Sequence, residues 1–178
     1  MDIGTISSRY AKALLRYALE CKAEESVYQQ ALALSRTMMQ VRELDKALLN
    51  PVLDKATKLS LLTEAAGGTL HEAFIRFIDL LFSHHRERHL LFVLHSFVGL
   101  YRRHQRIYVG QLTTAVPLDK PTEQHLRDMI AQAVKGTIEF DLHVDEDILG
   151  GFILQLDDRR LDASVKGQLR HLQKELGR

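Results

Sequence analysis

Apolar residues over the first hundred positions recur at three- and four-residue steps, which is typical of helices that bury one face. The helical pattern breaks at Asn50-Pro51, because a residue before proline avoids helical backbone angles, and at Gly67-Gly68, which favours a helix end. Connections this short place consecutive helices antiparallel, so the pattern predicts a compact bundle of six helices. The apolar stripes are Ile6, Tyr10, Ala13, Leu14, Tyr17, Ala18 and Cys21 in the first helix, Val27, Ala31, Leu34, Met38 and Val41 in the second, Leu59, Leu62 and Ala65 in the fourth, Phe74, Phe77, Ile78 and Leu81 in the fifth, and Leu91, Leu94, Phe97 or Val98, and Tyr101 in the sixth.

Near Arg106 the spacing of apolar residues changes to a two-residue period, which is typical of strands that bury one face. The fold class is therefore mainly α: a six-helix bundle over residues 1–105 is followed by a small α/β module over residues 106–178. The elements expected in the module are a strand Ile107–Val116 stopped by Pro117 and Pro121, a short helix from Thr122 carrying Leu126, Ile130, Ala133 and Val134 and closed by Gly136, an alternating strand Ile138–Val144, a third strand Ile148–Leu156 turned by Asp157 and Asp158, and a last helix capped by Ser164.

Composition describes a globular chain with almost balanced charge. Hydrophobic residues make up 46% and charged residues 26%, which is too apolar for a disordered chain. The net charge of +1 disfavours a protein whose main role is to bind nucleic-acid phosphates. The longest uncharged run, His89–Tyr101, is too short to cross a bilayer, and the start Met1-Asp2-Ile3 leads into no export segment. We expect a soluble protein that faces the cytoplasm.

The single cysteine, Cys21, cannot form an internal disulfide, which fits a reducing compartment. It falls on the apolar stripe of the first helix, so we expect a buried structural thiol rather than a nucleophile.

A histidine cluster raises the alternative of a metal-dependent hydrolase. His85 and His89 lie one helical turn apart and His84 is adjacent, but a zinc site needs three or four converging ligands. Arg86 and Arg88 between them would repel a divalent cation. A solvated polar junction between two helices is the favoured interpretation, and no metal is expected.

Acidic residues near the C-terminus could hold magnesium or supply an acid–base pair. Their order matches no EF-hand loop, and aspartate is common in turns and at helix starts, so turns are favoured. Gly150-Gly151 lacks the lysine and hydroxyl residue of a phosphate loop and instead indicates a bulge or a close backbone approach. The acidic residues are Asp145, Glu146, Asp147, Asp157, Asp158 and Asp162.

Two further surfaces leave alternatives open. The basic run Arg102, Arg103, His104 and Arg106 permits nucleic-acid contact, although cations at a helix end complement the helix dipole. The last helix carries a narrow leucine seam that either pairs with a partner or packs on the module's own sheet. Periodicity alone slightly favours the sheet. We define the leucine seam as Val165, Leu169, Leu172 and Leu176.

Four stretches resemble one protein family, in the right order and over essentially the whole chain. Ser8–Leu14 is similar to the R-Y-A-x-A-L opening of the delta subunit of bacterial F-type ATP synthases, relatives of the oligomycin-sensitivity-conferring protein. Leu49-Asn50-Pro51 with Lys55 resembles the family's N-P element. Val144–Phe152 and Asp162–Leu169 resemble its C-terminal signature, V-D-x-x-L-I-G-G followed by D-x-S-V-x-x-x-L. The sequence departs from the family pattern at two places: Ile148-Leu149 replaces Leu-Ile, and His84-His85 stands where the family often has asparagine.

The resemblance implies a non-catalytic stator subunit without cofactor, metal or catalytic residues. In the family, a six-helix N-terminal bundle binds alpha subunits of the catalytic head in a groove between its first and fifth helices. The C-terminal module binds the b subunits of the peripheral stalk, so the protein would lie peripherally at the cytoplasmic face of the bacterial inner membrane. The residues that the resemblance implies for alpha-subunit binding are Tyr10, Leu14, Tyr17, Phe74 and Ile78. The face that it implies for b-subunit binding is the leucine seam. The histidines receive no role. A metal-dependent hydrolase and a small nucleic-acid-binding protein remain the alternatives.

Overall fold

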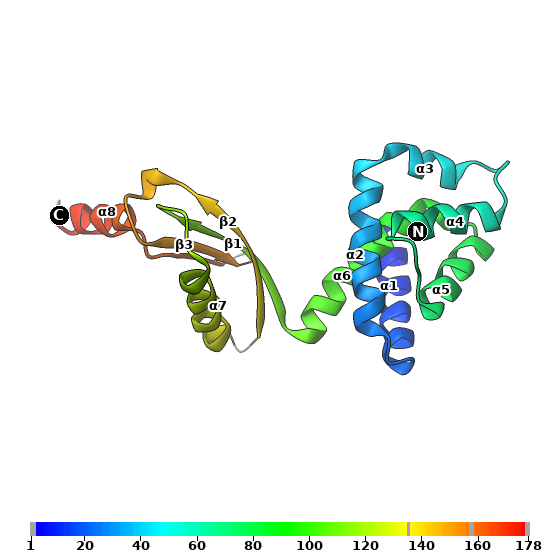
Figure 1. Ribbon diagram of the computed structural model, residues 1–178, viewed down its shortest axis with the longest axis horizontal. Helices are drawn as coiled ribbons and strands as arrows, with labels where there is room; N and C mark the ends of the chain where they lie inside the picture. Colours follow the sequence, from blue (N-terminus) through cyan, green and yellow to red (C-terminus); the bar gives the residue numbers. More distant parts are fainter. Residues whose placement is uncertain (1–2, 135, 157–158, 177–178) are drawn as a thin grey trace. The chain divides into compact units, whose positions relative to one another are not determined.

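The computed structural model describes residues 3–134, 136–156 and 159–176, and within these ranges the chain is mainly helical with a small four-stranded sheet in its C-terminal part (Figure 1). The chain divides into two compact units, residues 1–101 and residues 102–178, which we call unit 1 and unit 2. The division falls four residues before the boundary expected from the sequence, inside the sixth helix.

Unit 1 consists of helices joined by short connections. Asn50 takes an extended conformation before Pro51, which confirms the expected helix break there. The next helix is capped by Asp54, whose side chain accepts a hydrogen bond from the Thr57 N–H (3.2 Å). Helices α1 and α2 lie side by side, and α5 also contacts α1 (Figure 1). The elements are α1 (Ile3–Glu20), α2 (Glu24–Gln40), α3 (Arg42–Leu49), α4 (Lys55–Ala65), α5 (Glu72–Ser83), the 3-10 turn η1 (Glu87–His89) and α6 (Leu90–Gln105).

The core of unit 1 includes a polar link between α2 and α6. Tyr101 stacks on Tyr28 with ring centroids 4.3 Å apart, and its hydroxyl donates a hydrogen bond to the Glu25 carboxylate. Burial and this carboxylate raise the pKa of Tyr101 above its ordinary value, so the phenol, which is neutral at physiological pH in any case, also stays protonated in more alkaline solution. The neutral hydroxyl therefore remains a donor that holds the two helices together.

The expectation of a buried Cys21 thiol is wrong. Helix α1 ends at Glu20, one residue before the cysteine, and Lys22 takes a positive φ of 52° in the turn that follows. Cys21 is therefore carried off the apolar stripe of α1 and is exposed.

Unit 2 is a sheet with strand order β2-β1-β3-β4. Strands β1 and β2 are parallel and joined by helix α7, whereas β3 runs antiparallel to both β1 and β4. Helix α7 covers one face of the sheet, where Leu112, Ile130, Ile138, Phe140 and Leu154 form the core. The elements are β1 (Ile107–Thr114), α7 (Lys120–Val134), β2 (Thr137–Val144), the 3-10 turn η2 (Glu146–Ile148), β3 (Phe152–Leu156), β4 (Arg159–Asp162) and α8 (Val165–Leu176).

Three details of unit 2 correct the sequence prediction. The third strand begins at Phe152 rather than at Ile148, because the Asp145 side chain accepts from the Asp147 N–H to start η2, and Leu149 takes a positive φ of 66°. The first strand ends at Thr114, and α7 begins at Lys120 with Pro121 in its first turn, where proline fits. Strand β4 was not predicted at all. The expected turn at Asp157 and Asp158, and the side chains of Ala133 and Val134, lie outside the described residues.

Candidate interaction surfaces

The leucine seam of α8 faces solvent. Val165 is 42% exposed, Leu169 48% and Leu172 52%, while the side chain of Leu176 lies outside the described residues. The described core of unit 2 is built by the sheet and α7, and no α8 side chain belongs to it. Figure 1 shows α8 extending beyond the sheet, whereas α7 lies against it. The leucines therefore form an apolar surface instead of packing on the sheet.

The first turn of α8 is held by a compact set of hydrogen bonds. Ser164 is buried, and its hydroxyl donates to Asp162 Oδ1 (2.5 Å) and accepts from the Gly167 N–H (3.0 Å). The Val165 N–H donates to the Gly150 carbonyl (3.1 Å), which ties the helix to the turn before β3. Ser164 therefore caps α8 as expected, and Asp162 orients the cap.

The glycine pair allows this turn to approach the start of α8. A Cβ atom on Gly151 would lie 2.2 Å from the Ala163 carbonyl oxygen, and Gly151 has a positive φ of 73°. A Cβ atom on Gly150 would lie 3.1 Å from Val165 Cγ2. The contact at Gly151 leaves no room for a side chain, which confirms the expected close backbone approach, whereas a side chain at Gly150 would require Val165 to shift by a few tenths of an ångström. The two halves of the C-terminal signature thus meet in space, where they position the seam.

Replacement of Ser164 by alanine should raise the pKa of Asp162. The Ser164 hydroxyl and backbone N–H hold this pKa below its ordinary value, and nearby Arg160 contributes. A depressed carboxyl pKa stabilises the fold above the unfolded value of about 3.9, and the stabilisation is lost as the pH falls through the folded pKa. Titration of the Asp162 carboxyl by NMR in wild type and Ser164→Ala measures the change. An unchanged pKa would show that the hydroxyl does not hold this carboxylate.

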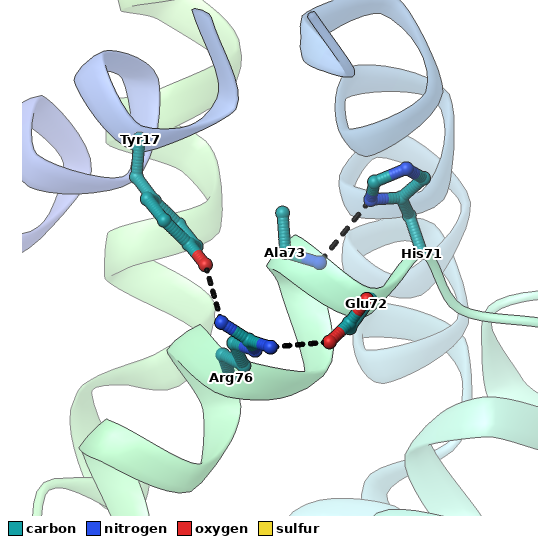
Figure 2. Close-up of polar contacts among 5 residues, drawn as sticks. All are labelled: Tyr17, His71, Glu72, Ala73 and Arg76. Carbon is teal, nitrogen blue, oxygen red and sulfur yellow. Dashed lines mark hydrogen bonds and ion pairs between the residues drawn. The ribbon is translucent and has the colours of Figure 1, made fainter. Parts of the chain in front are cut away.

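A shallow groove of about 300 Å³ lies on unit 1 where α1 meets α5. We define the α1–α5 groove by the residues that line it: Ile6, Arg9, Tyr10, Ala13, Leu80 and Arg86. Close to the groove, Figure 2 shows Arg76 of α5 between Tyr17 of α1 and Glu72. The Arg76 guanidinium donates to the Tyr17 hydroxyl (3.4 Å) and pairs with the Glu72 carboxylate. The bond to Tyr17 joins the two helices on their exposed side, and the pair with Glu72, one turn away on α5, holds the guanidinium in place.

The residues carried over for alpha-subunit binding divide into two groups. Leu14, Phe74 and Ile78 have no exposed surface, so in this structure they hold the helices together. Tyr10 and Tyr17 are half-buried, and Tyr10 lines the groove with its ring edge-on to Phe77 (centroids 6.4 Å apart).

Sequence reasoning missed Leu80 and the two arginines of the groove. Leu80 is 44% exposed, while the rest of the apolar stripe of α5 is buried. An apolar residue that falls off the stripe of an amphipathic helix is the signal that could have identified it. Arg9 and Arg86 carry no such signal, because exposed arginines are common.

The histidines do not converge. His84 and His85 are exposed, whereas His89 is buried, and its burial, with Arg86 and Arg88 nearby, lowers its pKa. Over the described ranges no three His, Cys, Asp or Glu side chains are arranged to hold a metal ion. Within the same ranges no helix has the length and apolar content needed to cross a membrane.

Part of the basic run and part of the acidic cluster have structural roles. Arg102, Arg103 and His104 lie in the last turn of α6, as expected for cations at a helix end, and Arg102 pairs with Glu139 (3.3 Å). Asp145 and Asp162 accept the turn and cap hydrogen bonds described above. Asp157 and Asp158 lie outside the described residues.

Comparisons with known proteins agree along the whole chain. The family model of the ATP synthase delta (OSCP) subunit matches residues 6–176. The chain is 41% identical over 176 residues to ATP synthase subunit delta of Phocaeicola vulgatus, covering 98% of this chain and 95% of that protein. It is 32% identical over 178 residues to ATP synthase subunit delta of Prochlorococcus marinus, covering 99% and 97%.

A solved structure shows the same fold. A chain in the cryo-EM structure of the Toxoplasma gondii mitochondrial ATP synthase hexamer aligns with a TM-score of 0.65 and 21% identity, covering 97% of both chains. The family model and the relatives above 30% identity span nearly all of the sequence, including the signature that anchors α8. This chain therefore belongs to the ATP synthase delta (OSCP) subunit family.

Proposed function

We propose that this chain connects the catalytic head of an F-type ATP synthase to its peripheral stalk, with unit 1 on the head and unit 2 on the stalk. The observation that carries the proposal is the outward leucine seam of α8, because an amphipathic helix normally buries its apolar face. Family membership makes the chain a component of the stator, and the seam supplies an unpartnered surface on which another helix can pack.

The head contact is assigned to unit 1. Helices α1 to α6 would form the six-helix bundle of the family, and the α1–α5 groove would hold an N-terminal helix of an alpha subunit. Tyr10, Ala13 and Leu80 offer apolar surface in the groove, while Leu14, Phe74 and Ile78 beneath them fix the spacing of the helices. An amphipathic helix laid in such a groove is held by apolar side chains one turn apart.

The stalk contact is assigned to α8 of unit 2. The seam residues follow one another at steps of four and three, the spacing with which one helix packs along another. Helices of the b subunits would therefore lie along the seam. The subunit would have no catalytic role of its own and would be held peripherally at the cytoplasmic face of the membrane through the b subunits.

Two separate surfaces suit the mechanical task. Rotary catalysis requires that the head be held while the central shaft turns, so the connector needs lasting interfaces. A nanomolar contact corresponds to about 12 kcal/mol of binding free energy. When one interface has formed, the second forms within the same assembly at a raised effective concentration.

Reconstitution tests the proposal directly. Membranes and catalytic heads stripped of their delta subunit should regain ion-driven ATP synthesis when the purified chain is added in equimolar amount, and should stay uncoupled without it. The chain alone should hydrolyse no ATP. Recovery of coupling in the absence of the chain, or failure of the chain to attach to the head, would refute the assignment.

A further inference from the structure

Cations surround the α1–α5 groove. Arg9, Lys12 and Arg16 recur at steps of three and four on α1, so they lie along one face of the helix, and all three are exposed. Arg9 also lines the groove itself, and Arg86 joins it from the segment between α5 and η1. The apolar floor of the groove therefore has a positively charged rim.

Few carboxylates offset this charge. Two shallow hollows along the outward face of α1 are lined by Arg9, Lys12 and Arg16, and Glu20 at the end of the helix is the one acidic residue that lines either of them. Glu72 on α5 is paired with Arg76, and Asp79 does not line the groove although it precedes Leu80. The whole chain carries a net charge of only +1, so this surface concentrates positive charge that the rest of the molecule balances.

We propose that the groove selects an amphipathic helix whose apolar ridge is flanked by aspartate or glutamate side chains. The inference rests on the proposed head contact and adds the chemistry of its partner. Apolar ridge residues would enter between Tyr10, Ala13 and Leu80, and carboxylates on the flanks would pair with Arg9, Arg16 and Arg86. Rim charges of this kind speed association and fix the orientation of the partner, and salt screens them.

Three synthetic helical peptides test the proposal on the full chain. All share one apolar ridge, and their flanking positions carry glutamate, glutamine or lysine. At low salt the glutamate peptide should bind about tenfold more tightly than the glutamine peptide, as expected for two exposed ion pairs, and the lysine peptide should bind most weakly. The preference for glutamate should disappear near 1 M salt, where the screening length is about 3 Å.

Two pairs of arginine substitutions test whether the preference for glutamate depends on the cations beside the groove. Arg9→Gln with Arg16→Gln should abolish the preference for glutamate, whereas Arg36→Gln with Arg42→Gln removes the same charge from exposed positions on α2 and α3 and should preserve it. Equal binding of the glutamate and glutamine peptides, together with an intact head contact, would overturn the proposal and leave the proposed function standing. Loss of attachment between the wild-type chain and the catalytic head would overturn both.

Discussion

Double replacement of Leu169 and Leu172 by glutamate should detach the protein from the b subunits while leaving both units folded. Each leucine is about half exposed in the free chain, so binding buries the remaining half of its surface, worth about 1 kcal/mol per residue. Loss of both contributions raises the dissociation constant at least about thirtyfold, and the cost of desolvating two carboxylates adds to this. Binding of stalk fragments, followed by calorimetry, measures the effect.

A matched control distinguishes the loss of apolar surface in the leucine seam from the effect of two added negative charges. Gln168→Glu with Gln173→Glu adds the same two charges to α8 beside the seam rather than on it, and should weaken binding far less. Hydrogen exchange along Ile138–Val144 should stay protected in both variants, because the core under α7 contains no α8 side chain. If the seam variant binds the b subunits with unchanged affinity, α8 is not part of the stalk contact.

Replacement of Leu14 by arginine should unfold unit 1. The side chain has no exposed surface, so the guanidinium would be buried without a counter-charge, at a cost of several kcal/mol. That cost approaches the whole free energy of unfolding of an ordinary domain, about 5 to 15 kcal/mol. Circular dichroism should show loss of the cooperative thermal transition and of much of the helical signal.

The adjacent residue provides the folding control for this experiment. Ala13 is exposed and lines the α1–α5 groove, so Ala13→Arg should leave the thermal transition nearly unchanged. The same long side chain would fill the groove and block the head contact. A folded Ala13→Arg variant that binds the head as tightly as wild type would place the contact elsewhere on unit 1. A folded Leu14→Arg variant would contradict the packing described for α1.

Helix positions in unit 1 could be predicted because apolar periodicity and helix-breaking residues agreed. Asn50-Pro51 marks a boundary that the structure places at the same residues. Cys21 shows the limit of this reasoning, since one residue beyond a helix end is enough to leave the apolar stripe. In unit 2 the apolar pattern of Ile148–Leu156 concealed a 3-10 turn, because a side-chain cap and a positive φ at Leu149 are not visible in hydrophobicity.

The surfaces were harder to predict than the elements. Spacing identified the seam of α8 but could not show whether the sheet or solvent lies opposite it, because that depends on which helix covers the sheet. Alternation in β2 likewise suggested four buried residues, yet Leu142 and Val144 are 41% and 43% exposed. On α1 the sequence placed Leu14 and Tyr17 on one stripe, and only the packing against α5 distinguishes a wholly buried leucine from a half-buried tyrosine.

The cap at Ser164 fixes α8 to unit 2 at the N-terminal end of the helix, so the helix can act mechanically as a lever. The helix has twelve residues and is therefore about 18 Å long, and among the residues that the structure describes, the hydrogen bonds that tie it to the rest of unit 2 lie in its first turn. A force applied across the helix axis near Leu172 would bend α8 about the Asp162–Ser164 cap, because most of the helix length lies between the point of force and the cap. If the stalk binds as proposed, bending between the stalk and unit 2 would be concentrated at the few hydrogen bonds of this cap. A stalk helix that contacts the whole seam would then stiffen the joint by supporting the far end of α8.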